Sequence, residues 1–379
     1  MKRISYLFLA LFFFSCDIDT LDTPSAQYEG MSVFANYKDP VFARKPKNII
    51  LLIGDGMGIS QITAGLYMNG NKLNLERFPI IGLHKTYSGS HLVTDSAAGA
   101  TALACGIKTY NGAVGVNMDT LPVRNILEIA EAKGMATGLI ATSTVVHATP
   151  AAFIAHQKHR EMYEEIAADF LKTEIDFFVG GGKKYFDRRS TDDRNLYSEM
   201  QENGYVVSDY YQNELINCEL SWNKNFAYFT ADNDPLPVSQ GRDYLYAASK
   251  MGMAFLTRHS QEGFFLMIEG SQIDWGGHTN DSDYLISEVL DFDRTIGSAL
   301  DFAAKNNETL VIVTADHETG GYSILKDSKM DDHLVTAFTT DYHTADLIPV
   351  FAFGPGAEAF SGIYENTAIF KKIKKALER

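Results

Sequence analysis

Three acidic side chains stand at the ends of strongly apolar runs in this 379-residue chain, and their placement suits cation chemistry. Asp55, Glu269 and Asp316 each close such a run. Long apolar runs are typical of buried parallel strands, whose carboxyl ends meet at one edge of a sheet. Carboxylates that converge there repel one another unless cations neutralise them. One such residue would more often cap a helix, but three at equivalent places predict a metal site.

Histidines accompany these carboxylates. Asp274 and His278 are four residues apart, a spacing that places both on one side of a helical turn. His317 directly follows Asp316, so these two can share a metal only from an irregular turn. His343 stands shortly before the last apolar run. Mixed aspartate and histidine ligands favour zinc.

A second donor set contains only oxygen. Asp55, Thr149 and Glu269 offer carboxylate and hydroxyl oxygens, which are the donors that magnesium prefers. The remaining histidines lack a comparable setting, and a lone histidine is more often structural than a ligand. We give this structural interpretation to His84, His91, His156, His159, His259 and His333.

A candidate nucleophile lies within residues 93–100. A strand-like stretch there passes into alanine-rich sequence, which predicts that Ser96 lies in the first turn of a helix. That position favours an anion, and a serine there is a nucleophile once its proton is removed. The alternative is that Ser96 only caps the helix.

Ionisation of Ser96 needs an external cause. The chain has no G-x-S-x-G motif, and no histidine–aspartate relay adjoins Ser96, so a metal is the more economical activator. Two zinc ions about 4 Å apart suit in-line displacement at phosphorus. A phosphoryl group also needs a bidentate donor, for which Arg160 is the candidate, although alone it would be a solvated helix residue.

Strands and helices that alternate along the chain must position these residues. This alternation predicts an α/β fold: a three-layer sandwich with a large, mostly parallel central sheet flanked by helices. The polar, tyrosine-rich residues 183–240 predict no definite element. Apolar runs predict strands at 48–53, 135–142, 175–179, 264–270, 309–315 and 347–353, and helical periodicity predicts helices at 121–133, 158–172, 242–259, 284–305 and from 366.

The N-terminus predicts export. A basic pair precedes an apolar run over 4–14 that is too short to span a bilayer comfortably. The following Ser15 and Cys16 resemble a bacterial lipobox, with an ordinary secretory signal as the alternative. We therefore predict a signal peptide at 1–15, a lipid on Cys16, a flexible tether at 16–45 and one catalytic domain at 46–379.

The net charge excludes one class of partner, and the cysteines suggest a structural role. The formal net charge of −15 excludes a basic nucleic-acid-binding surface. Cys105 is interpreted as a buried thiol, and a disulfide between Cys105 and Cys218 stays open.

The motifs, taken in this order, resemble those of the alkaline phosphatase family. Their order is specific, although each motif alone would be weak. The resemblance implies a phosphomonoesterase with the three-layer fold described above. It extends over residues 48–355 and rests on the segments 53–58, 94–98, 147–150, 269–278, 314–321 and 343–345.

The resemblance also implies a role for each site residue. Ser96 would be the nucleophile that becomes phosphoserine, Arg160 would clamp the phosphate oxygens, and Asp95 would orient Arg160. The metal ligands would be Asp274, His278 and His343 for a first zinc ion, Asp55, Asp316 and His317 with Ser96 for a second, and Asp55, Thr149 and Glu269 for magnesium.

Three departures from the best-known bacterial pattern affect metal content, phosphate binding and assembly. His147 replaces an aspartate in the magnesium shell, which puts magnesium occupancy in question. Trp275 replaces a lysine that reaches phosphate through water, so product phosphate should bind less tightly. Only about 25 residues separate His317 from His343, so the large insertion that covers the dimer of longer members is absent and a homodimer stays open.

The expected protein is an alkaline phosphatase, anchored through Cys16 in the periplasm or at the outer membrane. It would release inorganic phosphate from many small phosphate monoesters, with two zinc ions and one magnesium ion. A phosphodiesterase or a sulfatase of the same superfamily is one alternative. The sulfatase motif is absent around Ser96, which argues against a sulfatase. Thr149 and Glu269 argue against a phosphodiesterase, because such enzymes usually lack a third metal site. The other alternative is a phosphate- or metal-binding lipoprotein without turnover, which would need no Ser96.

Overall fold

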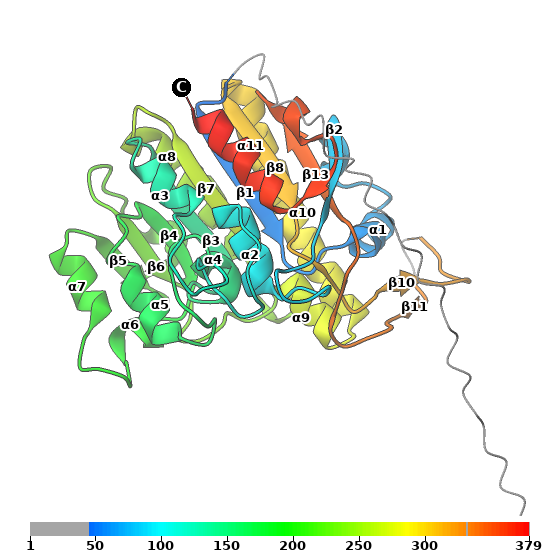
Figure 1. The fold of residues 1–379 in the computed structure, drawn as a ribbon, viewed down its shortest axis with the longest axis horizontal. Coiled ribbons are helices and arrows are strands. Elements are labelled where there is room, and N and C mark those ends of the chain that lie inside the picture. Colours follow the sequence, from blue (N-terminus) through cyan, green and yellow to red (C-terminus); the bar gives the residue numbers. More distant parts are fainter. Residues whose placement is uncertain (1–44, 331–332, 379) are drawn as a thin grey trace, which may run out of the picture. The chain divides into compact units, whose positions relative to one another are not determined.

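A ten-stranded sheet organises the part of the chain that the computed structural model describes, residues 45–330 and 333–378 (Figure 1). All neighbouring strands are parallel except those that flank β13, which runs against the other nine. Across the sheet the strands are β14 (Gly362–Glu365), β2 (Ile80–Lys85), β13 (Ile348–Phe353), β8 (Thr309–Thr314), β1 (Asn48–Gly54), β7 (Phe264–Gly270), β3 (Ala136–Thr144), β4 (Phe177–Gly181), β6 (Phe226–Phe229) and β5 (Val206–Asp209).

Helices cover both faces of the sheet, so the predicted three-layer α/β sandwich is confirmed. Successive residues of buried β1 point to opposite faces: Ile49 and Leu51 into one core, Ile50 and Leu52 into the other. The first core is covered by α2 (Ser96–Cys105), α3 (Ile126–Glu131), α4 (Ala148–Ala151), α5 (Tyr163–Asp169), α6 (Lys184–Asp187), α7 (Leu196–Glu202) and α11 (Thr367–Leu377), and the second by α1 (Ile59–Tyr67), α8 (Tyr244–His259), α9 (Gln272–His278) and α10 (Ser282–Asn306).

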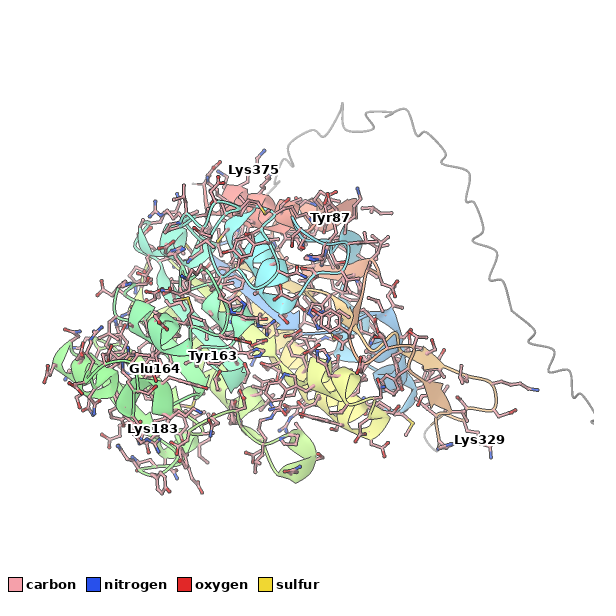
Figure 2. The ribbon with its side chains drawn as sticks, turned by 60° about the horizontal axis from the view of Figure 1, so that its bottom comes forward. Tyr87, Tyr163, Glu164, Lys183, Lys329 and Lys375 are labelled. Carbon is pink, nitrogen blue, oxygen red and sulfur yellow. The ribbon has the colours of Figure 1, made fainter. Side chains whose placement is uncertain are left out.

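Two small antiparallel pairs lie outside the main sheet. The pair formed by β9 (Glu318–Thr319) and β12 (His343–Thr344) joins segments that are far apart in sequence. The other pair joins β10 (Ser323–Ile324) and β11 (Thr336–Ala337). Figure 2 shows Lys329, between β10 and β11, and Lys183, before α6, toward opposite ends of the sheet. Short 3-10 turns are η1 (Asn74–Arg77), η2 (Leu215–Asn217), η3 (Val238–Gln240) and η4 (Ala357–Phe360).

Two predicted helices are shorter than expected. The helix predicted at 121–133 begins only at α3, because Asn125 and Glu128 form a reciprocal capping box there. The helix predicted at 158–172 begins only at α5, because the preceding residues are held in a loop. In that loop the N–H of Arg160 donates to the carbonyl of Gly112 at 2.8 Å.

Several strands were not predicted. Residues 183–240 contribute β5 and β6 as well as α6 and α7, although their periodicity is weak. Strands β2 and β14 at the other end of the sheet are also additions, and each has one face in partial contact with solvent. Four-residue strands such as β5, β6 and β14 are too short for a periodic signal.

Cys105 is buried as predicted, and the disulfide that the sequence left open is not formed, since both Cys105 and Cys218 are free. Among the described residues, no helix is long and apolar enough to cross a membrane. The predicted signal peptide, Cys16 and the tether up to residue 44 lie outside the described residues.

Candidate active site

The three carboxylates predicted to converge do so at the carboxyl ends of adjacent strands. Strand β1 lies between β7 and β8, and Ile53 of β1 is in register with Glu269 of β7. Asp55 follows β1 directly, and Asp316 follows β8 after one residue. All three side chains are fully buried. The sheet therefore places three acidic groups where water cannot screen them.

Gly56 permits the close packing that brings α9 to this edge. Its φ of +73° is unfavourable for other residues. A Cβ atom there would lie 2.8 Å from the Cα of Asp274 and 2.7 Å from Oγ1 of Thr319. Both Asp274 and Thr319 can approach the turn after β1 only because Gly56 lacks a side chain.

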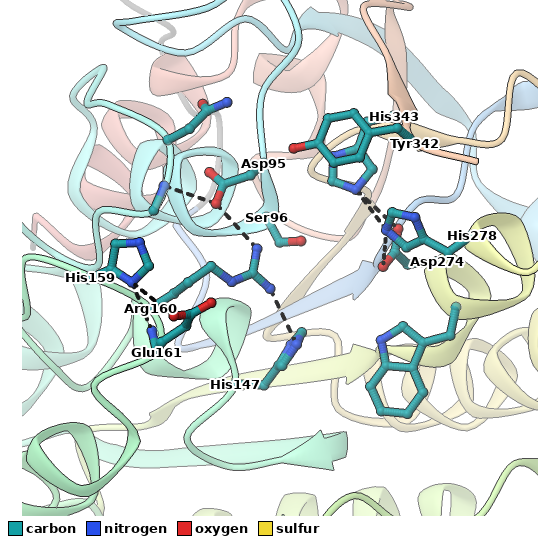
Figure 3. A pocket seen from close by; sticks show the side chains of 13 residues that line it. Asp95, Ser96, His147, His159, Arg160, Glu161, Asp274, His278, Tyr342 and His343 are labelled. Carbon is teal, nitrogen blue, oxygen red and sulfur yellow. Dashed lines mark hydrogen bonds and ion pairs between the residues drawn. The ribbon is translucent and has the colours of Figure 1, made fainter. Parts of the chain in front are cut away.

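The first donor group joins α9 to β12. Asp274 and His278 both lie in α9, as the spacing predicted, and their Oδ2 and Nε2 atoms are 3.3 Å apart. His343 Nε2 lies 3.5 Å from Asp274 Oδ1 and 3.1 Å from His278 Nε2 (Figure 3). These three residues offer ligand atoms that all lie within 4.8 Å of one another.

The hydrogen bonds of the two rings define which nitrogens face the group. Nδ1 of His343 donates to the carbonyl of Thr94 at 2.8 Å, and Nδ1 of His278 donates to the carbonyl of Asp341 at 2.6 Å. The two Nε2 atoms are left facing each other and Asp274. Two bare ring nitrogens repel at 3.1 Å, so a proton or a cation must lie between them. Two imidazoles and one carboxylate with oriented rings suit zinc.

The second donor group surrounds the candidate nucleophile. Ser96 is the first residue of α2, whose N-cap is Asp95 rather than Ser96 itself. Ser96 Oγ lies 3.2 Å from His317 Nε2. The same Nε2 lies 3.3 Å from Asp316 and 3.5 Å from Asp55. The structure therefore brings Ser96 to a group of two carboxylates and one imidazole.

The third donor group consists of Asp55, His147 and Glu269, with Thr149 in the short helix α4 that follows His147. Asp55 is shared by the second and third groups. His147 Nε2 lies 3.3 Å from Nη2 of Arg160 and accepts from it, because a guanidinium only donates. Burial, and then the charge of Arg160, lowers the pKa of His147 to about 3, so this ring is neutral.

Unpaired polar atoms show where cations fit. Buried polar atoms in folded proteins nearly always have a hydrogen-bond partner. Six of the exceptions lie in the second and third groups, as expected of donors that await a metal ion, and the others lie elsewhere in the described residues. Among residues 45–330 and 333–378, the buried atoms without a partner include both oxygens of Asp55, Oε1 of Glu269, Oδ2 of Asp316, Oγ1 of Thr149 and Nδ1 of His147.

Burial also changes the pKa values of the three carboxylates at this edge of the sheet. Burial, followed by the charges of Asp316, Asp274 and Glu269, raises the pKa of Asp55 well above its ordinary value. Burial also raises the pKa of Glu269 to about 8 and that of Asp316 to about 7. The carboxylates thus retain protons in the absence of cations, and divalent cations would replace those protons.

Arg160 and Ser96, the candidate nucleophile, line one open cavity of about 530 Å³ (Figure 3). Its Nη1 lies 3.2 Å from Oδ2 of Asp95, which also accepts from the N–H of Gly112 at 2.9 Å. Trp275 lines the same cavity, with its ring edge-on to His147 at a centroid distance of 6.0 Å. The residues predicted around the phosphoryl group therefore share one hollow.

Sequence reasoning missed some residues of this cavity. His159, interpreted as structural, lines its rim with a half-exposed ring. The ring of Tyr342 stacks on that of His343 at 4.3 Å and also lines the cavity. Thr319, in β9, contacts Asp274 of the first donor group and His317 of the second. The only sequence signal for Tyr342 and Thr319 is their closeness to His343 and His317.

Relatives of known name match most of this chain. Residues 46–334 match the family model described as alkaline phosphatase. Alkaline phosphatase 3 of Bacillus subtilis (strain 168) is 34% identical, over 88% of this chain and 89% of its own. The alkaline phosphatase of Escherichia coli (strain K12) is 31% identical, over 90% of this chain and 88% of its own.

Solved structures agree with these relatives. The alkaline phosphatase from the Antarctic bacterium TAB5 is 44% identical with a TM-score of 0.82, covering 88% of this chain and 98% of that one. A histidine-to-aspartate variant of the same protein, with magnesium bound in its M3 site, matches with a TM-score of 0.81 and 44% identity, covering 88% of this chain and 99% of that one.

Proposed function

Because the chain belongs to the alkaline phosphatase family, whose members hydrolyse phosphate monoesters, we propose that it acts through a covalent phosphate ester of Ser96 at a site for two zinc ions and one magnesium ion. One observation carries the proposal. Ser96 Oγ lies 3.2 Å from His317 Nε2, at the start of α2 and beside three groups of metal-type ligands.

The three donor groups support an assignment of three cations. Bound there, the cations would supply positive charge that lowers the pKa of a hydroxyl group and offsets the charge of the phosphoryl oxygens. We assign Asp274, His278 and His343 to one zinc ion, Asp55, Asp316 and His317 with Ser96 to the other, and Asp55, Thr149 and Glu269, with His147 beside them, to magnesium.

Ser96 supplies the nucleophile for two successive displacements. Its deprotonated Oγ forms a bond to phosphorus while the bond from phosphorus to the alcohol oxygen breaks, and the alcohol leaves after gaining a proton from solvent. A water molecule that loses its proton then bonds to phosphorus, and the bond to Oγ breaks. Inorganic phosphate is released and Ser96 is restored. Since serine and water must both lose protons, we expect turnover to rise toward alkaline pH.

Arg160 and α2 hold the phosphoryl group for this reaction. The guanidinium presents paired N–H donors to phosphoryl oxygens, while its contact with Asp95 fixes its direction. The first turn of α2 adds the positive end of a helix dipole beside Ser96. Every named contact addresses the phosphoryl group and none addresses the alcohol, so the enzyme should accept many small monoesters.

Magnesium at the third group is supported by a solved relative. The TAB5 variant that binds magnesium in its M3 site carries aspartate in place of a histidine. In this chain the third group contains His147 together with Asp55 and Glu269. A neutral imidazole is a poorer magnesium ligand than a carboxylate, so we propose a magnesium site of modest occupancy.

Export, anchoring and assembly are further parts of the proposal. The basic and apolar N-terminus and Cys16 support a lipoprotein of the periplasm or the outer membrane, and a homodimer stays open. Labelling of cells with a radioactive fatty acid tests the anchor. We expect wild type to be labelled and Cys16→Ser to be unlabelled; label in both, or in neither, contradicts the anchor.

Substitution of the nucleophile tests the mechanism. We expect Ser96→Ala to lose nearly all turnover of p-nitrophenyl phosphate while it retains bound zinc. Ser249→Ala is the matched control, because Ser249 is equally buried but donates within α8, to the carbonyl of Leu245. Turnover by Ser96→Ala close to that of the control contradicts the nucleophile. Faster turnover of bis-p-nitrophenyl phosphate than of the monoester would indicate a diesterase instead.

A further inference from the structure

Thr319 joins the first two donor groups through one hydroxyl. It lies in β9 and is fully buried. Its Oγ1 donates a hydrogen bond to Oδ1 of Asp274, in the first group, and lies 3.2 Å from Nδ1 of His317, in the second. Thr319 is itself outside the assigned ligand sets, yet it contacts one ligand of each.

The direction of these hydrogen bonds follows from their chemistry. An ionised carboxylate only accepts, so the hydroxyl proton of Thr319 points to Asp274. The same oxygen then has only lone pairs left and must accept from Nδ1–H of His317. The proton of this ring is thereby fixed on Nδ1. Nε2 of His317 then carries a lone pair that faces Ser96. This is the tautomer that His317 needs in order to bind a metal ion through Nε2.

The surroundings of Thr319 hold its hydroxyl in this place. Its N–H donates to the carbonyl of Gly56 at 3.2 Å, and its carbonyl accepts from Nε2 of Gln61 at 2.8 Å. Its methyl packs against the backbone of Gly277 in α9, so tightly that a Cβ there would lie 2.8 Å from Cγ2. Backbone and side chain are both fixed, so the hydroxyl has little freedom to reorient.

We propose that Thr319 is a positioning residue that couples the two zinc sites: its single hydroxyl orients Asp274 in one site and sets the tautomer of His317 in the other. The proposal rests on the proposed function only through the assignment of zinc to these two groups. Loss of an outer partner of a metal ligand typically weakens metal binding by about 10- to 100-fold. Because one hydroxyl serves both groups, its removal should weaken both sites together.

Zinc titration of the metal-free full chain tests this coupling. The variants are Thr319→Val and Thr319→Ala, which lack the hydroxyl, and Thr319→Ser, which keeps it and loses only the methyl. We expect both zinc sites of the first two variants to bind about 10- to 100-fold more weakly than wild type, and Thr319→Ser to bind within a few-fold of wild type. The readout is zinc affinity against a competing chelator, which needs no turnover.

Thr309→Val is the matched control for lost stability. Thr309 is also a buried threonine, but it lies at the start of β8, at the end of that strand away from the site, where its Oγ1 accepts from Asn48 at 3.1 Å and donates to Asn306 at 3.0 Å. We expect Thr309→Val to unfold more easily while it binds zinc as wild type does. If Thr319→Val does not fold, Thr319→Ala and Thr319→Ser still decide the question.

Three outcomes overturn the proposal: zinc affinity in Thr319→Ala equal to that of Thr309→Val, weakening at one site only, or equal weakening in Thr319→Ser. Kinetics add an independent measure, since altered ligand geometry should lower kcat more than it raises KM. If wild type binds two zinc ions but turns over no monoester, the proposed function fails while the coupling by Thr319 stands.

Discussion

Replacement of Glu269 by glutamine should make the metal-free protein more stable at alkaline pH. Burial raises the pKa of Glu269 from 4.5 to about 8. Between these two values the folded state holds a proton that the unfolded state has released, so stability falls as pH rises. The slope for one group is about 1.4 kcal/mol per pH unit, which gives about 2 kcal/mol between pH 6.5 and pH 8.

The comparison between wild type and Glu269→Gln isolates this contribution. Lys372, whose pKa is lowered to about 7 by burial, produces a slope of the opposite sign in the upper part of this range, but it does so in both proteins. The charge of Glu269 also raises the pKa of Asp55. This coupling is lost in Glu269→Gln, so it adds to the difference in pH dependence between the two proteins. Above pH 6.5 the buried neutral histidines add little, because histidine is largely neutral in the unfolded chain as well.

Denaturant and thermal unfolding of chelator-treated protein at pH 6.5 and pH 8 provide the assay. We expect wild type to lose about 2 kcal/mol more than Glu269→Gln, or about 3 °C in Tm for a domain of this size. Wild type loaded with zinc and magnesium is the control. In this metal-loaded protein the free energy of unfolding should no longer fall with pH, or should rise, because metal ions replace the protons and bind more tightly as pH rises. Equal pH slopes for the two metal-free proteins would refute the reasoning.

Three further substitutions address the cavity. Trp275→Lys should tighten inhibition by inorganic phosphate, because it adds a cation beside the anion; an unchanged or higher inhibition constant contradicts this role. Asp95→Asn should raise KM about 5- to 30-fold, since the loss of a charged partner of Arg160 costs about 1–2 kcal/mol. A KM like that of wild type would show that Arg160 needs no such partner. His147→Asp should bind magnesium at least 10-fold more tightly than wild type, because a carboxylate is a better magnesium ligand than an imidazole. Magnesium titration of the magnesium-free proteins measures this, and equal affinity of the two proteins would place His147 outside the proposed magnesium site.

Much of the fold follows from local sequence. The apolar run of β1 identifies it as a central strand, because a strand with both faces covered needs no polar alternation. The four-residue spacing of Asp274 and His278 holds because both lie in α9. The alanine-rich start of α2 places Ser96 correctly, although Asp95 supplies the cap. Membership of the alkaline phosphatase family, inferred from motifs in a specific order, is confirmed by the family model.

Other features depend on contacts between distant segments. The reversed direction of β13 has no local signal, since the same apolar run suits a parallel or an antiparallel strand. Residues 183–240 add β5 and β6 to the sheet only because β4 offers β6 a partner. Paired with a neighbour, even a four-residue strand is stable, whereas alone it leaves no periodic pattern.

Local sequence predicts which of the candidate residues end a strand or begin a helix, because apolar periodicity and helix-start signals are local properties. Tertiary structure alone decided how these ends meet. The pairing of β9 with β12 brings His343 beside His317, and the glycine turn after β1 admits Thr319 between Asp274 and His317. Both depend on backbone contacts across more than twenty residues of sequence, which no local pattern encodes.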